Sequence, residues 1–81
     1  MHAEVFSKDN CLSCIRAKDL LTKRGVPYDE ISAVEHRDTL IERVTAITGK
    51  PPAAVPQIFI DGEHIGGYEA LIAWFAKALV A

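Results

Sequence analysis

Apolar positions change from strand-like to helix-like spacing several times along the chain, and this pattern predicts seven elements. Strands are expected where short apolar runs occur, as at Val5 and Phe6, and helices where apolar residues recur every three or four positions. Gly25 and Gly49 follow the first two helical segments, where glycine is a typical helix end. The elements are a strand at 3–7, a helix at 12–24, a strand at 28–31, a helix at 33–48, a strand at 57–61, a short strand at 64–65 and a helix at 68–80.

Local signals add detail to these elements. Ser32 and Glu35 predict a capping box at the start of the second helix, and Asp61-Gly62 predicts a hairpin turn. The run 58–60 is continuously apolar, so the third strand is expected to be buried on both faces. Apolar residues at helical spacing are Cys14, Ala17 and Leu21 in the first helix and Leu40, Ile41, Val44 and Ile47 in the second. In the last helix, the side chains expected to face inward are Leu71, Ile72, Phe75 and Leu79.

The order β-α-β-α-β-β-α predicts an α/β fold, with a four-stranded mixed sheet flanked by three helices. The first two strands are joined by a helix and should be parallel, whereas the last two form a hairpin. The chain has 81 residues, which is the length of one small domain. We therefore expect a single domain over residues 1–81.

Composition and charge exclude several classes of protein. Hydrophobic residues make up 49% of the chain, which is too many for a disordered protein. The net charge is −2 with both signs interspersed, so no basic stripe for nucleic acid is visible. The apolar run 70–76 is far shorter than the roughly 20 residues of a membrane span. The start of the chain lacks the features of a secretory signal, and we expect a cytoplasmic location.

Cys11 and Cys14 form a C-x-x-C pair at the junction of the first strand and the first helix. A sulfur at a helix N-terminus is stabilised as thiolate by backbone N–H groups and the helix dipole. The pair therefore predicts a redox dithiol in which Cys11 attacks and Cys14 resolves. A zinc site would need four ligands, and only three scattered histidines accompany the two cysteines, so we assign no metal. The other alternative is that both cysteines are simply buried, although an exposed helix start is a poor position at which to bury a thiol.

Three segments together resemble the glutaredoxins, small proteins with a thioredoxin-like fold, over essentially the full length. They are Lys8-Asp9-Asn10-Cys11-Leu12-Ser13-Cys14, then Ala54-Val55-Pro56-Gln57-Ile58-Phe59-Ile60-Asp61-Gly62, and then His64-Ile65-Gly66-Gly67-Tyr68-Glu69. A C-x-x-C pair alone is common, but these segments at these intervals are highly specific.

The resemblance implies a glutathione site beside the cysteines. The residue matching Pro56 forms a cis peptide bond in the family, and the one matching Val55 pairs its backbone with the cysteinyl part of glutathione. The lysine matching Lys8 attracts the glycine carboxylate and would favour the Cys11 thiolate by its charge. Arg43 is a weaker candidate for the same carboxylate. Each of these residues also has a purely structural alternative. Pro56 would be a trans proline at the start of a strand, and Lys8 and Arg43 would be solvated surface charges.

The resemblance also implies that the γ-glutamyl end of glutathione lies at the start of the last helix, near Gly67, Tyr68 and Glu69. Glu69 stands where the family usually has Asp, and its alternative is a favourable acid in the first helical turn. Ala70 replaces a second common Asp. In the motif itself, Leu12 and Ser13 replace the usual Pro and Tyr. Ala54 replaces a usual Thr, a change that backbone contacts tolerate.

The predicted function is a glutathione-dependent thiol–disulfide oxidoreductase. It needs no tightly bound cofactor, only glutathione as electron donor, and its partners are glutathione and disulfide-containing or glutathionylated client proteins. No nucleic-acid or membrane partner is expected, and we expect a monomer. Two alternatives stay open: a redoxin reduced by thioredoxin reductase that serves ribonucleotide reductase, and a dimer holding a [2Fe–2S] cluster with Cys11 and glutathione as ligands.

Overall fold

A computed structural model of the chain describes the backbone of residues 1–80 and the side chains of residues 1–78. The sheet has the strand order β2-β1-β3-β4, with β1 parallel to β2 and antiparallel to β3, and β3 antiparallel to β4. The predicted mixed sheet and its element order are confirmed. The elements are β1 (Ala3–Ser7), α1 (Leu12–Lys23), β2 (Tyr28–Ser32), α2 (Arg37–Thr48), β3 (Gln57–Ile60), β4 (Glu63–Gly66) and α3 (Tyr68–Val80).

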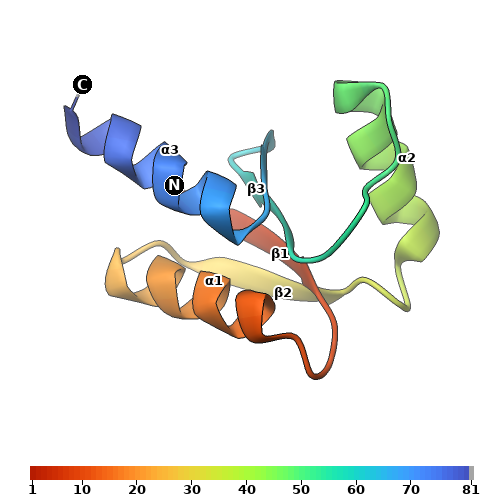
Figure 1. Cartoon of the computed structure of the whole chain (residues 1–81), viewed down its shortest axis with the longest axis horizontal. Helices are drawn as coiled ribbons and strands as arrows, with labels where there is room; N and C mark the ends of the chain where they lie inside the picture. Colours follow the sequence, from red (N-terminus) through yellow and green to blue (C-terminus); the bar gives the residue numbers. More distant parts are fainter. Residues whose placement is uncertain (81) are drawn as a thin grey trace.

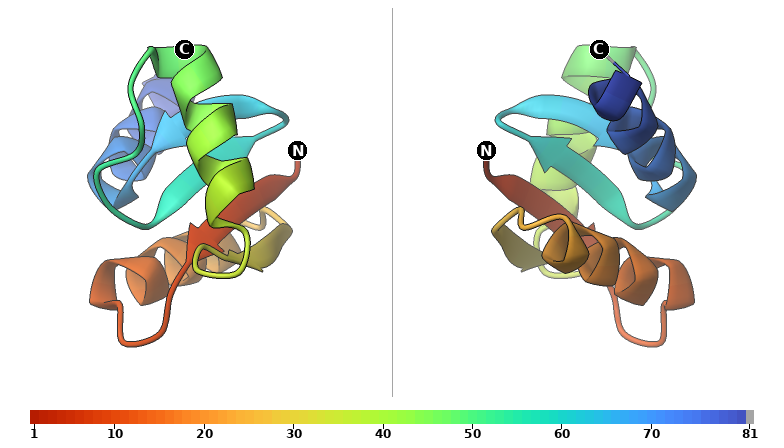
Figure 2. Two further views of the ribbon diagram at one scale, coloured as in Figure 1. Left: turned by 90° about the vertical axis from the view of Figure 1, so that its right-hand side faces the viewer. Right: turned by 90° about the vertical axis from the view of Figure 1, so that its left-hand side faces the viewer.

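The sheet lies between helices α1 and α3 on one side and α2 on the other (Figure 1). An apolar cluster fills each side. Helices α1 and α3 cover one face, where the larger cluster is centred on Val5, Leu21 and Leu71. Helix α2 covers the other face, with a smaller cluster around Phe6 and Phe59 (Figure 2). Residues 58–60 of β3 are buried, so the prediction of a strand buried on both faces is confirmed.

Helix α2 begins at Arg37, four residues later than predicted. Ala33 is buried and its N–H donates to the Ser7 carbonyl at 2.8 Å, which continues the pairing of β1 with β2 beyond the end of the strand. The Ser32 hydroxyl accepts from the Glu35 N–H at 3.1 Å. This side-chain cap therefore closes the turn over residues 33–36 instead of the helix, because the chain must first complete its strand pairing.

Two apolar side chains of the predicted helical patterns point outward, and one of them, Ile72, was expected to face inward. Ile72 is 46% exposed, since Leu71 and Phe75 occupy the stripe of α3 that faces the sheet. Ile47 is also exposed, because it lies in the last turn of α2, beyond the buried Leu40 and Val44. The predicted inward position of Leu79 falls outside the described side chains.

Strand register brings three distant segments to one edge of the sheet. Phe6 near the end of β1 pairs with Gln57 at the start of β3, and Ile58 pairs with Gly66 at the end of β4. The segments that follow or precede these positions therefore meet at this edge. They are the loop 8–11, the segment 54–56 and the turn at Gly67.

Candidate active site

The two cysteines lie at the N-terminus of α1 and form a disulfide in this structure. Cys11 is the residue that precedes the helix, and its sulfur accepts from the Cys14 N–H at 3.2 Å. Cys14 is 1% exposed and Cys11 is 8% exposed. An N–H and a helix dipole directed at the Cys11 sulfur favour negative charge there once the disulfide opens.

The two residues between the cysteines have different environments. The Ser13 hydroxyl lies 3.5 Å from the Cys11 sulfur, within range of a weak hydrogen bond. Leu12 is 61% exposed, and Ile15 in the next turn is also exposed. An apolar surface therefore borders the disulfide on the solvent side of α1.

The Val55–Pro56 peptide bond is cis, as the resemblance implied. Pro56 is buried, and the Val55 carbonyl oxygen lies 3.9 Å from the Cys11 sulfur. The backbone of this segment is thus immediately beside the sulfur that is predicted to react.

Lys8, Arg37 and Val55 line one cavity of about 520 Å³. They come from the loop after β1, the first turn of α2 and the segment before β3, so only the fold brings them together. Two cationic residues therefore line the same cavity as Val55. Lys8 also borders a cavity of about 700 Å³ beside residues 30–36, but only the smaller cavity includes Val55.

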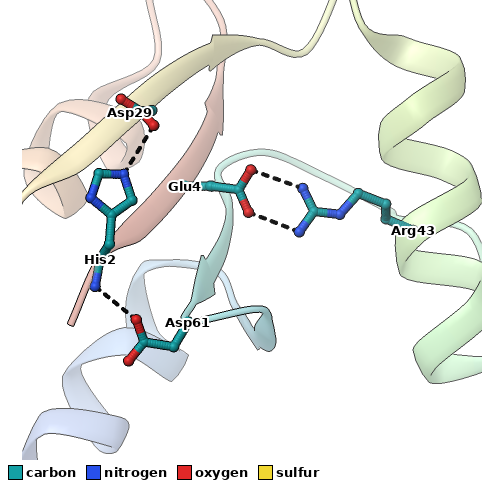
Figure 3. Close-up of polar contacts among 5 residues, drawn as sticks. All are labelled: His2, Glu4, Asp29, Arg43 and Asp61. Atoms are coloured by element: carbon teal, nitrogen blue, oxygen red, sulfur yellow. Dashed lines mark hydrogen bonds and ion pairs between the residues drawn. The ribbon is translucent and has the colours of Figure 1, made fainter.

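Arg37 was not singled out from the sequence, whereas Arg43 was, and the structure gives Arg43 another role. Its guanidinium donates to both carboxylate oxygens of Glu4, at 2.9 and 3.2 Å (Figure 3). It also stacks over the Phe59 ring at 4.0 Å from the centroid. Arg43 therefore fixes α2 to the sheet, and it is not among the residues that line the cavity with Lys8 and Val55. The sequence pattern did not single out Arg37 because it placed the start of this helix at residue 33. In the structure Arg37 is the first residue of α2.

The turn into α3 brings Gly67 next to the cis-proline segment. A Cβ built on Gly67 would lie 3.6 Å from the Pro56 carbonyl oxygen. Gly66 has φ +119, and a Cβ there would be 3.1 Å from the Ala70 side chain, so both backbone and space favour glycine. Tyr68 packs partly against the larger core cluster, and Glu69 is exposed in the first turn of α3.

A polar network supports the loop that carries Lys8. The hydroxyl of Ser7, a buried residue, donates to Glu30 at 2.6 Å, and the Lys18 ammonium donates to the same carboxylate oxygen at 2.7 Å. The hydrogen bond from Lys18, followed by that from Ser7, lowers the pKa of Glu30 below its ordinary value. This network joins the end of β1 to β2 and to α1.

Comparison with known families identifies the chain. The glutaredoxin family matches residues 3–65, which include both cysteines and the Val55–Pro56 segment. The chain belongs to the glutaredoxin family. Glutaredoxins are glutathione-dependent thiol–disulfide oxidoreductases, and this chain is therefore an enzyme of that class.

Individual glutaredoxins agree with this assignment. Glutaredoxin 1 of Escherichia coli is 37% identical over 86 aligned residues, which cover 100% of both chains. The structure of glutaredoxin 1 from Francisella tularensis complexed with cacodylate superposes with a TM-score of 0.76 at 30% identity, over 99% of this chain and 98% of that one. A buckwheat glutaredoxin–glutathione complex gives 0.75 at 31% identity, over 94% and 69%.

Two further observations concern other partners. Within residues 1–80, none of the helices has the length and apolar character needed to cross a membrane. No group of three or more His, Cys, Asp or Glu side chains in the described part of the chain is arranged to hold a metal ion.

Proposed function

We propose that this glutaredoxin removes glutathione from mixed disulfides through Cys11 alone. The Cys11 thiolate attacks the glutathione sulfur of a mixed disulfide, the Cys11–glutathione bond forms, and the client leaves as a thiol. A second glutathione thiolate then attacks the same glutathione sulfur. Glutathione disulfide leaves, and Cys11 returns to the thiolate.

The same pair is proposed to reduce disulfides within client proteins by a second route. Cys11 attacks one client sulfur and releases the other as thiolate, after which Cys14 attacks Cys11 and frees the reduced client. The product is the Cys11–Cys14 disulfide, the form present in this structure. Two molecules of glutathione return it to the dithiol and become glutathione disulfide.

We assign the ligand-binding roles from the cavity that Val55 lines, since the Val55 carbonyl lies close to the Cys11 sulfur. Lys8 and Arg37 bind the glycine carboxylate, and the Val55 backbone pairs with the cysteinyl residue of glutathione. Pro56 forms the wall next to the sulfurs. At the other end, the γ-glutamyl group lies against Gly67 and Tyr68, and Glu69 faces its ammonium group.

One observation carries this proposal: the Val55 carbonyl lies 3.9 Å from the Cys11 sulfur and Val55 shares a cavity with Lys8 and Arg37. A tripeptide whose sulfur is bonded to Cys11 could therefore pair with the Val55 backbone and extend into the cavity lined by Lys8 and Arg37. The solved buckwheat glutaredoxin–glutathione complex, with its similar fold, supports glutathione as the ligand class.

The remaining parts of the proposal concern the setting in the cell. We propose that the protein acts as a single-domain monomer in the cytoplasm, where a reducing glutathione pool keeps the dithiol available. Its clients are proteins that carry accessible disulfides or glutathionylated cysteines, and the exposed Leu12 beside Cys11 offers them an apolar contact.

The test is NADPH-coupled reduction of a glutathione mixed disulfide. One reaction contains glutathione and glutathione reductase, and a second contains thioredoxin reductase alone. Turnover in the first reaction only is expected. Turnover in the second only would retain the Cys11–Cys14 chemistry and overturn the glutathione site, whereas no turnover in either would favour a cluster-binding role.

A further inference from the structure

A chain of two hydrogen bonds links His64 on β4 to the segment that carries Val55. The Gln57 side-chain nitrogen donates to the Ala54 carbonyl at 2.8 Å. The Gln57 side-chain oxygen lies 2.8 Å from Nε2 of His64. Neither residue belongs to the ligand site described above.

The chemistry of the groups fixes the direction of both bonds. A backbone carbonyl can only accept, so the Gln57 amide must direct its NH₂ group towards Ala54. Its oxygen then faces His64 and can also only accept, so His64 must carry a proton on Nε2. Burial lowers the pKa of His64 below its ordinary value, which favours the neutral ring with a single proton. The Ala54 carbonyl thus sets the orientation of the Gln57 amide, and the amide oxygen in turn sets the tautomer of the ring.

The fold holds His64 in place for this contact. His64 pairs across the sheet with Phe59, and the two ring centroids lie 5.1 Å apart. Gln57 precedes Phe59 by two residues and therefore shares its face of β3, diagonal to His64. The pairing of β3 with β4 is irregular next to this pair, between Ile58 and Phe59.

We infer that Gln57 and His64 are positioning residues that hold the Ala54–Val55 backbone in the orientation needed to pair with glutathione. The Gln57 amide anchors the carbonyl immediately before Val55, and the hydrogen bond from His64 to the amide oxygen holds that side chain in place. This inference rests on the proposed function, because it requires the Val55 backbone to bind the tripeptide. Neither side chain takes part in sulfur exchange.

The experiment measures the equilibrium of mixed-disulfide formation in a Cys14→Ser background. Cys11 thiolate reacts with glutathione disulfide to give the Cys11–glutathione disulfide and one glutathione, and intact mass gives the ratio at several glutathione redox ratios. Gln57→Met keeps the length and neutrality of the side chain but removes both hydrogen bonds. It should lower the equilibrium constant about five-fold, which is about 1 kcal/mol at 1.4 kcal/mol per tenfold change.

His64→Phe keeps an aromatic ring on Phe59 and removes only the donor to Gln57. It should lower the same constant about two-fold, and it should add nothing further once Gln57→Met is present. His2→Phe makes the matched change at a histidine whose ring contacts Asp29 on β2 at 2.9 Å, and it should leave the constant unchanged.

Bis(2-hydroxyethyl) disulfide separates positioning from a general structural effect. This disulfide has no peptide backbone, so its exchange with Cys11 should be the same in all variants. Equal losses with both disulfides, or no loss with glutathione disulfide in Gln57→Met, would overturn the inference. If the protein with native Gln57 and His64 shows no preference for glutathione disulfide over the hydroxyethyl compound, the proposed glutathione site itself fails.

Discussion

The dithiol (the sulfur end) and the proposed glutathione cavity (the ligand end) are built in different ways. Cys11 and Cys14 lie one helical turn apart, so their disulfide and the hydrogen bond between them follow from four consecutive residues. Lys8, Arg37 and Val55 are distant in sequence, and they share a cavity because β1, α2 and β3 pack around one sheet edge.

This difference indicates which changes each end tolerates. A local motif keeps its geometry as long as the first turn of α1 forms, and its chemistry depends on the two sulfurs. The ligand end depends on the docking of α2 and on the backbone of two turns. Loss of stability elsewhere should therefore affect ligand binding before it affects sulfur chemistry.

The largest expected effect is at the sulfur end. Cys11→Ser should reduce turnover with glutathione mixed disulfides to the uncatalysed rate, because a serine hydroxyl is not ionised at neutral pH. Cys14→Ser should keep this activity and lose the reduction of intramolecular client disulfides. The coupled assay with one substrate of each kind measures both. If Cys14→Ser abolishes both activities, Cys14 does more than resolve the mixed disulfide.

The two arginines of α2 should give opposite results. Arg43→Ala leaves Glu4 without its partner and uncovers Phe59, and should lower the free energy of unfolding by about 2 kcal/mol. Arg37→Ala should change the free energy of unfolding by less than about 0.5 kcal/mol. It should, however, raise KM for the mixed disulfide about five-fold.

Urea unfolding and steady-state kinetics of both variants test this pair. Rising salt should raise KM of the unmutated enzyme and reduce the difference between it and Arg37→Ala, since exposed charges are screened. A larger KM change for Arg43→Ala than for Arg37→Ala, with both proteins folded, would contradict the assignment of a structural role to Arg43 and a binding role to Arg37.

Glycine at the turn into α3 is the next test. Gly66→Ala should cost about 2 kcal/mol of stability, because φ is +119 and the new methyl group would meet Ala70 at 3.1 Å. Gly25→Ala is the matched control: φ is +72 with open space around it, and the cost should be about 1 kcal/mol. Thermal unfolding compares the two, and equal costs would mean that the contact with Ala70 relaxes freely.

The smallest expected effect concerns the network beneath the Lys8 loop. Because Lys18 and Ser7 lower the pKa of Glu30, its contribution to stability is complete above its ordinary value of 4.5 and is lost as the pH falls through the lower folded value. Glu30→Gln should therefore flatten the loss of stability in acid. The change should be below about 1 kcal/mol, since the Glu30 side chain is 46% exposed.

Unfolding free energies measured from pH 7 down to about pH 3 test this expectation. Glu42→Gln, at an exposed position on α2, provides the control and should leave the pH dependence unchanged. An equally steep acid dependence in Glu30→Gln would show that the network contributes nothing to folding.

The sequence by itself determined the element order, the position of the dithiol and the family. Apolar periodicity, glycines at helix ends and the Asp61-Gly62 turn act over a few residues, and these local signals predicted the sheet and its hairpin. The C-x-x-C pair at a helix start is equally local. The match of residues 3–65 to the glutaredoxin family confirmed the interpretation of the motifs.

Only the tertiary structure decided which cations line the cavity with Val55 and which side chains contact the segment that precedes it. Arg37 and Arg43 are both arginines on one helix, and their roles depend on the true start of α2 and on which side meets Glu4 and Phe59. The link from His64 through Gln57 to Ala54 likewise requires strand register. These contacts depend on how the helices pack on the sheet and on how the strands pair. The local preferences of the sequence for helix, strand or turn carry no information about either.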